Sequence, residues 1–184
     1  MPVSIEDGGL NGLLLVRTGL FRDDRGFFAE TYSQHMFRGA GLDVAFVQDN
    51  LSESRRGTLR GMHYQVRPQA MGKLVRCIRG AIFDVAVDLR QGSPTFGQWK
   101  GHPLNEENGL TLFIPEGFAH GFIALEDHAL VHYKCTAHHS PECERSLSYR
   151  CPKIGIEWPL EPLIISRKDA EAPGLDEADH NFQY

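Results

Sequence analysis

The chain has 184 residues, of which 41% are hydrophobic, 10% aromatic and 23% charged, and its formal charge at pH 7 is -5. This composition predicts one globular domain over residues 1–184 with a substantial core, and it excludes an intrinsically disordered chain. No apolar run approaches the roughly 18 residues of a membrane-spanning helix, and the acidic balance offers no broad basic field for nucleic acid.

The predicted secondary structure consists mainly of short strands. The 19 glycines, 10 prolines and 11 phenylalanines favour such strands over long helices. Alternation and turn signals predict strands at residues 58–65, 73–78, 81–89, 96–100, 110–114, 119–125 and 129–136. Helical segments are expected only near residues 33–37 and in the tail after residue 166. This spacing predicts an all-β barrel or jelly roll with short peripheral helices.

The amino-terminal residues and the cysteines indicate the compartment. Residues 1–9 contain neither a basic segment nor an unbroken apolar stretch, so we do not expect a secretory signal. Cys77, Cys135, Cys143 and Cys151 form no C-x-x-C pair and are interpreted as free thiols of a reducing compartment. The expected location is the cytoplasm.

Two histidines stand among apolar residues, where each alone is typical of a core histidine. His120 completes a P-x-G-x-x-H sequence, which is the second half of the metal-binding cupin signature. The first half is not met, because His63 is followed by Tyr64 and Gln65 instead of a second histidine and a carboxylate. We interpret the chain as a cupin-like scaffold for metal-free acid and base chemistry. A metal-dependent cupin is the alternative.

Nine blocks of sequence, in order over nearly the whole chain, resemble the dTDP-4-dehydrorhamnose 3,5-epimerase family. They are residues 21–30, 47–50, 59–65, 72–77, 83–90, 93–97, 114–122, 133–136 and 166–169. The resemblance implies a cupin-like jelly roll (double-stranded β-helix). It also implies a cofactor-free isomerase that inverts C3 and C5 of dTDP-4-dehydro-6-deoxy-D-glucose through enolates, giving dTDP-4-dehydro-L-rhamnose.

The reaction implied by the resemblance needs a base, an acid on the opposite side of the sugar ring and a cation near the enolate oxygen. His63 matches the base, and an imidazole suits that role because it titrates near neutrality. Tyr133 matches the proton donor and Lys73 the cation. Asp169 matches the carboxylate that orients His63, with Asp84 as its rival.

The resemblance also implies the substrate contacts. These are Phe21, Arg25, Glu30, Gln48, Asn50, Arg60, His120, His139, Glu144 and Lys168. Arg25 and Arg60, with Lys168 nearby, match diphosphate contacts, because guanidinium groups suit phosphate oxygens. The implied assembly is a homodimer in which the amino-terminal part of one chain completes its neighbour's site.

Two features of the sequence qualify these expectations. Strict alternation puts Arg60 and His63 on opposite faces of their strand, so both can serve one pocket only if the strand bulges at Gly61. His138 and His139 stand where the family usually has aromatic residues. The alternatives are therefore a mono-epimerase, an epimerase for a CDP-, GDP- or UDP-linked 4-keto sugar, and a sugar-binding jelly roll without catalysis.

Overall fold

The computed structural model describes residues 3–184. Its elements, in chain order, are β1 (Val3–Asp7), β2 (Leu14–Thr18), β3 (Phe21–Asp23), β4 (Gly26–Phe28), α1 (Gln34–Gly39), β5 (Gln48–Ser54), β6 (Thr58–Gln65), β7 (Lys73–Arg79), β8 (Ala81–Asp88), β9 (Trp99–Asn105), β10 (Leu110–Ile114), β11 (Phe118–Ala124), β12 (Ala129–Cys135), β13 (Glu144–Ser146), β14 (Ile164–Ile165) and α2 (Arg167–Ala170). No helix in this part of the chain is both long enough and apolar enough to cross a membrane.

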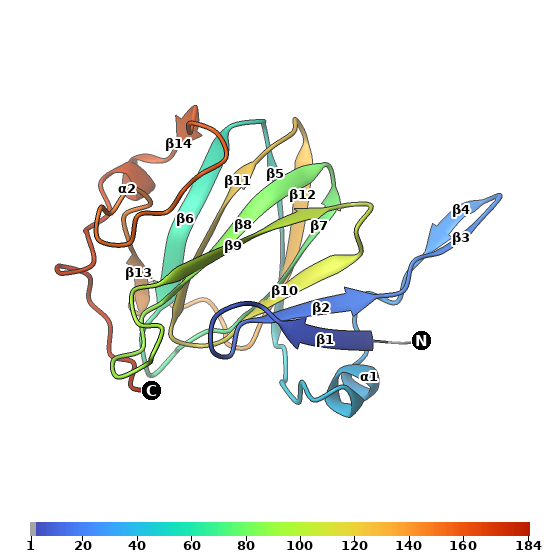
Figure 1. Cartoon of the computed structure of the whole chain (residues 1–184), viewed down its shortest axis with the longest axis horizontal. Coiled ribbons are helices and arrows are strands. Elements are labelled where there is room, and N and C mark those ends of the chain that lie inside the picture. Colours follow the sequence, from blue (N-terminus) through green and yellow to red (C-terminus); the bar gives the residue numbers. More distant parts are fainter. Residues whose placement is uncertain (1–2) are drawn as a thin grey trace.

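Two sheets enclose the core (Figure 1). One has the strand order β1-β2-β10-β7-β12-β5, and the other has the order β13-β6-β11-β8-β9, with β14 added parallel to β6. A shared cluster of buried residues joins them, including Val75 and Leu112 from the first sheet and Ile82, Leu104 and Phe122 from the second. The prediction of an all-β, cupin-like jelly roll with short peripheral helices is confirmed.

The clearest predicted strands match β6, β7 and β8 closely. The prediction at residues 96–100 is wrong in its first half, because β9 begins only at Trp99. The preceding residues form a turn around the buried Asp88, whose Oδ2 accepts hydrogen bonds from the hydroxyls of Ser93 and Thr95 at 2.6 and 2.7 Å. The backbone N–H of Gly97 also donates to the Asp88 carbonyl, at 2.8 Å. These local bonds outweigh the strand propensity of Phe96.

The expected irregularity in β6 is present. His63 pairs with His120 of β11 and Arg60 pairs with Phe122, so three steps along β6 match two along β11. Gly61 lies at this bulge with φ of 122°, and a Cβ there would come within 2.5 Å of the β11 backbone. Only glycine tolerates both constraints. The bulge lets Arg60 and His63 line the same cavity.

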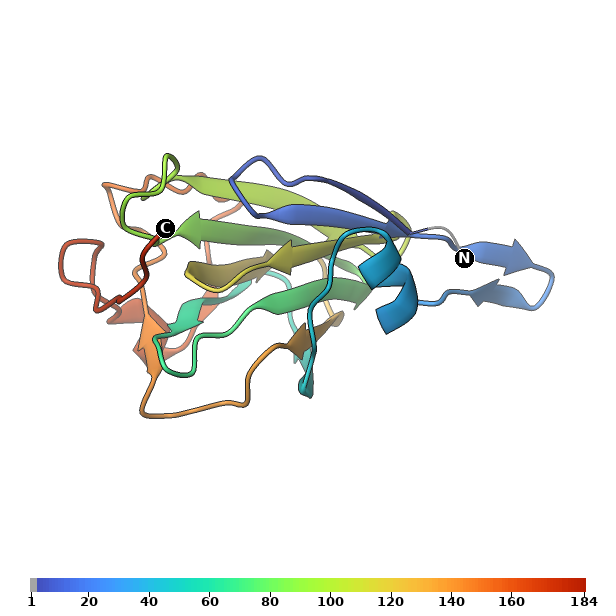
Figure 2. The ribbon, with the colours of Figure 1, turned by 90° about the horizontal axis from the view of Figure 1, so that it is seen from below.

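A two-stranded hairpin, β3–β4, projects away from the sheets (Figures 1 and 2). Its three phenylalanines, Phe21, Phe27 and Phe28, are 48%, 57% and 65% exposed. Helix α1 follows and buries Phe37 together with Val16 of the first sheet. The amino-terminal region is therefore anchored on either side of a hairpin that leaves its own aromatic rings in solvent.

Candidate active site

A cavity of about 460 Å³ collects most of the predicted catalytic and phosphate-binding residues. Its lining includes Arg60, His63, Lys73, His120, Tyr133, Lys168 and Asp169. A second cavity of about 250 Å³ shares His63, Lys73 and Tyr133 with the first. The predicted Gln48, Asn50, His139 and Glu144 line the second cavity. The two cavities thus form one cleft with the shared residues at its centre.

His63 and Asp169 form a close pair, with 2.6 Å between His63 Nε2 and Asp169 Oδ1. The Asp169 side chain is buried, whereas that of His63 is 32% exposed toward the cleft. Asp169 Oδ2 accepts a hydrogen bond from the Gly61 N–H at 3.2 Å, and Ser166 caps the N–H of Asp169. Burial alone raises the pKa of Asp169, but the hydrogen bond and charge of His63, together with the hydrogen bonds to Gly61 and Ser166, outweigh it, so the pKa is lowered. An ionised Asp169 keeps the proton on Nε2 of His63 and leaves Nδ1 as the basic nitrogen.

Asp84 has a different partner. Both of its carboxylate oxygens lie 3.0 Å from His120 Nε2, and the two side chains are buried. Burial lowers the pKa of His120, against the opposing charge of Asp84. The sequence left Asp84 and Asp169 as rivals for His63; in the structure Asp169 contacts His63, and Asp84 holds His120.

Tyr133 and Lys73 approach the cleft from the other sheet. Tyr133 lies on β12 and Lys73 on the neighbouring β7, whereas His63 lies on β6 of the facing sheet. Burial raises the pKa of Tyr133, so its hydroxyl stays protonated at neutral pH. Burial also lowers the pKa of Lys73, although nearby acidic groups oppose this. The cleft therefore carries an imidazole on one wall, and a phenol and an amine on the other.

Arg60 and Lys168 supply positive charge at the larger cavity. Arg60 Nε donates to Ser54 Oγ and Nη2 to the Glu53 carbonyl, both at 3.0 Å, so its hydrogen bonds go to neutral acceptors. Lys168 Nζ lies 2.6 Å from Glu144 Oε2. Fixed guanidinium and ammonium groups at the mouth of a cleft suit an anionic ligand.

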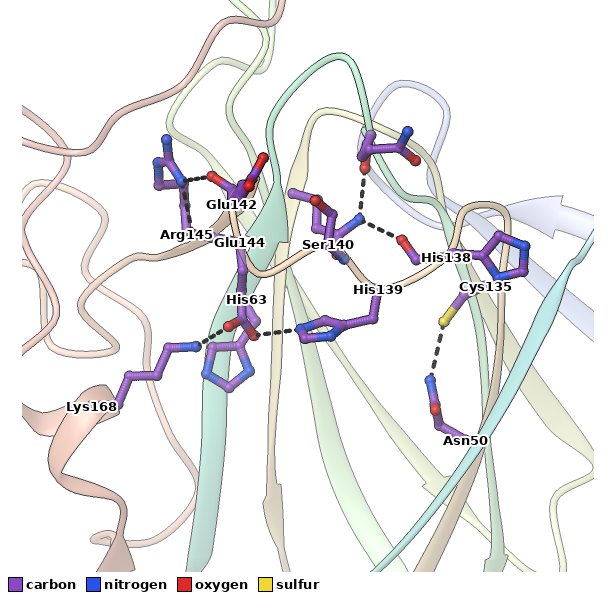
Figure 3. A network of polar contacts seen from close by, with 12 residues as sticks. Asn50, His63, Cys135, His138, His139, Ser140, Glu142, Glu144, Arg145 and Lys168 are labelled. Carbon is purple, nitrogen blue, oxygen red and sulfur yellow. Dashed lines mark hydrogen bonds and ion pairs between the residues drawn. The ribbon is translucent and has the colours of Figure 1, made fainter.

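The smaller cavity contains a polar network around Glu144 (Figure 3). Lys168 approaches one carboxylate oxygen of Glu144, and His139 Nε2 lies 3.7 Å from the other. Burial raises the pKa of Glu144, but the hydrogen bond and charge of Lys168, together with the charges of His63 and His139, outweigh it, so the pKa is lowered. Asn50 Nδ2 donates to Cys135 Sγ at 3.4 Å, and Gln48 Nε2 donates to Asn50 Oδ1 at 3.1 Å. This end of the cleft thus offers several hydrogen-bonding groups to a polar ligand.

Three predicted substrate contacts lie outside the cleft of their own chain. Phe21 and Arg25 belong to the projecting hairpin, and Glu30 follows it. Arg25 is bound to Asp23, with 2.6 Å between Nη2 and Oδ2, and its side chain is 90% exposed. Neither cavity includes any of the three among its lining residues.

Several lining residues were not singled out from the sequence. Ser52 lines the larger cavity, and its buried Oγ has no hydrogen-bond partner among residues 3–184. Asn50 and Gln48 lie two and four positions earlier on the same strand, so alternation along β5 was the signal that could have identified Ser52. Ile164 and Ile165 also line the cavity, but a two-residue parallel strand has no readable period.

The alternative of a metal-dependent cupin requires a set of ligands. Within residues 3–184, no group of three or more histidine, cysteine, aspartate or glutamate side chains could hold a metal ion. Gln65, at the place of the carboxylate in that signature, makes hydrogen bonds to backbone groups instead. The observed donors therefore do not fit the metal-site alternative.

Comparisons with known proteins agree with this geometry. The family model described as dTDP-4-dehydrorhamnose 3,5-epimerase matches residues 7–177. A protein of that name from Methanothermobacter thermautotrophicus is 53% identical over 163 residues, covering 87% of this chain and 88% of the relative. Another from Pseudomonas aeruginosa is 51% identical over 169 residues, covering 91% and 93%.

Solved structures are similar over almost the whole chain. The dTDP-6-deoxy-D-glucose-3,5-epimerase of Legionella pneumophila, in complex with dTDP-4-keto-L-rhamnose, has a TM-score of 0.91 and 44% identity, with 96% of this chain and 95% of that chain covered. ChmJ, a 3'-monoepimerase from Streptomyces bikiniensis in complex with dTDP-quinovose, has a TM-score of 0.84 and 38% identity, with 95% and 87% covered.

Proposed function

The chain belongs to the dTDP-4-dehydrorhamnose 3,5-epimerase family and is an isomerase; on this premise, we propose how it inverts a nucleotide-linked sugar. The substrate is dTDP-4-dehydro-6-deoxy-D-glucose, and inversion at C3 and C5 gives dTDP-4-dehydro-L-rhamnose. One observation carries the proposal. His63 lies on one sheet, Tyr133 and Lys73 lie on the other, and all three line the same cleft.

The proposed chemistry is one proton removal and one proton return at each carbon. The C4 ketone acidifies the hydrogens at C3 and C5, so His63 can take one and leave an enolate. The Lys73 ammonium offsets the negative charge on the enolate oxygen. Tyr133 then gives a proton to the carbon from the opposite side, which inverts the centre. Solvent returns a proton to Tyr133 and removes one from His63, so the reaction balances without a cofactor.

Asp169 supports this cycle through His63. Its buried carboxylate fixes the ring orientation and is placed to stabilise the imidazolium that forms after proton abstraction. The pKa of Asp169 is lowered, so the carboxylate is ionised when it is needed. We therefore assign Asp169 a positioning role rather than a contact with the sugar.

Different parts of the substrate bind to different residues along the cleft. Arg60 and Lys168 bind the diphosphate, because their charges flank the larger cavity. His120 contacts the sugar. The nucleoside lies toward the smaller cavity, and its proposed contacts are Gln48, Asn50, His139 and Glu144.

The projecting hairpin fits an exchange between two chains. Phe21, Arg25 and Glu30 match substrate contacts in sequence, yet they lie outside their own chain's cleft. Phe27 and Phe28 leave large apolar surfaces exposed on the same hairpin. We propose a homodimer in which each hairpin packs against the partner and brings Arg25 to its cleft.

The direct test is a hydrogen-exchange experiment. The protein is incubated with dTDP-4-dehydro-6-deoxy-D-glucose in D₂O, and deuterium at C3 and C5 is followed by NMR. Exchange at both carbons, with formation of the L-sugar, supports the proposal. The absence of exchange at both carbons overturns it for this substrate.

A mono-epimerase is the second candidate, because ChmJ is similar over nearly the whole chain and its described activity is 3'-monoepimerisation. In the same experiment, exchange at C3 alone identifies this activity. The nucleobase that the protein accepts is a separate question, because His138 and His139 stand where the family usually has aromatic residues. Thermal shifts with dTDP, CDP, GDP and UDP decide it, and a preference for a base other than thymine changes the substrate.

We further propose that residues 1–184 act as one epimerase domain and that the protein works in the cytoplasm. The first statement is supported by a cleft that draws residues from both sheets and from α2. The second is supported by four cysteines that are all free.

A further inference from the structure

The segment of residues 138–140, between β12 and β13, brings His139 to the smaller cavity (Figure 3). Its backbone is held from two sides. The N–H of His139 donates to Gln48 Oε1 at 2.9 Å. On the other side, the N–H of Ser140 donates to Gln65 Oε1 at 2.8 Å, and Gln65 Nε2 donates to the His138 carbonyl at 3.2 Å.

Gln65 is only 4% exposed, and both Oε1 and Nε2 of its side-chain amide are hydrogen-bonded. Besides the two bonds that flank His139, its Nε2 donates to the Gln69 carbonyl at 2.7 Å. The arrangement needs one acceptor and two donors on the same side chain, which is what an amide provides. A carboxylate of the same shape would face two carbonyl oxygens with no proton to offer.

The position of Gln65 in the sheet links this clamp to Glu144. Gln65 pairs with Glu144 in the register between β6 and β13. Glu144 is the residue whose carboxylate lies 3.7 Å from the His139 imidazole. Gln65 therefore fixes both groups: Glu144 through the backbone ladder, and His139 through the amide.

We propose that Gln65 is a positioning residue for nucleotide binding, which acts by holding His139 against Glu144 at the nucleoside end of the cleft. This inference rests on the proposed function. His63, Lys73 and Tyr133 lie on β6, β7 and β12 and make no side-chain hydrogen bond to residues 138–140 within the described structure. Loss of the clamp therefore weakens nucleotide binding and leaves the proton transfers in place.

The experiment compares Gln65→Glu with the wild type. We expect the Kd for dTDP and the KM for the nucleotide sugar to rise about 10-fold or more, while kcat stays within about twofold. Gln98→Glu is the matched control, because Gln98 is exposed and lines neither cavity. It should leave Kd, KM and kcat unchanged.

A pH series separates positioning from general damage. The carboxyl introduced by Gln65→Glu stands at a buried position and faces the carbonyls of Gln69 and His138, so it gains a proton as the pH falls and can again donate one hydrogen bond. The ratio of its dTDP Kd to that of the wild type should therefore fall between pH 8 and pH 6. A ratio that stays constant with pH contradicts the proposal.

Further variants test whether misfolding or an indirect effect explains the weaker binding of dTDP. Gln65→Asn keeps the amide but shortens it, and it should also weaken dTDP binding. Adding Gln65→Asn to His139→Ala should cause no further loss, because Gln65 acts through His139. A wild-type Kd in either folded Gln65 variant, or a fall in kcat with KM unchanged, overturns the inference. Because Kd is measured with dTDP alone, failure of the proposed reaction remains distinguishable from failure of this inference.

Discussion

His63 and Asp169 lie 106 positions apart in sequence, yet 2.6 Å separates His63 Nε2 from Asp169 Oδ1. The carboxylate sits in the first turn of α2, and Ser166 caps that helix through the N–H of Asp169. The bulge at Gly61 contributes a further N–H to the same carboxylate. The bulge in β6 and the short helix α2 therefore both position the pair of His63 and Asp169. Substitutions in this pair test the proposed mechanism.

Replacing Asp169 by asparagine should lower kcat by about 10²- to 10⁴-fold. The amide removes the charge that stabilises the imidazolium, and its N–H group can force the wrong tautomer on His63. Binding of dTDP should be little changed. Steady-state kinetics and calorimetry measure the two effects, with Asp176→Asn as a control at an exposed aspartate. A normal kcat would show that Asp169 does not act through His63.

Replacing Tyr133 by phenylalanine should separate exchange from inversion. His63 can still remove a proton and return one from solvent, because its side chain is 32% exposed. Deuterium should therefore enter the substrate with its configuration retained, while product formation falls by about 10²- to 10⁴-fold. NMR detects both outcomes. His63→Asn should remove exchange as well, and the control His128→Asn, at an exposed histidine, should behave as the wild type. Full inversion by Tyr133→Phe would remove Tyr133 as the proton donor.

Among the strands predicted from the sequence, the closest matches are those with a regular pattern over several residues. β6, β7 and β8 have seven or eight residues each and alternate around clear turns. The prediction at residues 96–100 was wrong at its start because hydrogen bonds to Asp88 fold those residues into a turn. β3, β4, β13 and β14 have only two or three residues, too few to show a period.

The candidate site could be predicted from matched sequence blocks, but its internal pairing could not. Asp84 and Asp169 were both open as partners of His63, since pairing depends on the β6 bulge and on where α2 docks. Gln65 was noted only as a residue that fails a metal signature. Its role in holding residues 138–140 depends on loop geometry that no local pattern encodes.

Lys73 should set the alkaline side of the activity profile. Burial lowers its pKa from the usual 10.5, whereas burial raises that of Tyr133 from 10.0. As the pH rises, Lys73 therefore loses its proton before Tyr133 does. The rise in pH should thus lower kcat at the point where Lys73 becomes neutral, which lies below the usual pKa of a lysine, because the enolate is no longer stabilised. In Lys73→Arg this fall should move to higher pH, since a guanidinium stays charged, although the rate at neutral pH drops. A pH–rate profile checks this, with Lys153→Arg as an exposed control. If the fall of kcat at high pH is unchanged in Lys73→Arg, another group causes it.

The proposed exchange of hairpins makes Arg25 and His63 parts of the same site from different chains. Arg25→Ala should weaken substrate binding through loss of a diphosphate contact, and His63→Asn should abolish proton removal. In a mixed dimer of these two variants, one cleft contains the intact His63 of one chain and the intact Arg25 of the other. The second cleft contains both substitutions.

At a low substrate concentration, co-expression of Arg25→Ala with His63→Asn should therefore give more activity per chain than either variant has alone. Random assortment makes half of the dimers mixed, and purification with two different affinity tags selects these. Each mixed dimer has one intact site of two, so about half of the wild-type activity per chain should return. The matched control is His63→Asn with Asp169→Asn, whose residues contact each other within one chain, so that every cleft stays defective. The L-sugar formed by dimers purified with two different affinity tags is the measurement. If Arg25→Ala with His63→Asn gives no more product per chain than Arg25→Ala alone, Arg25 does not act across the dimer.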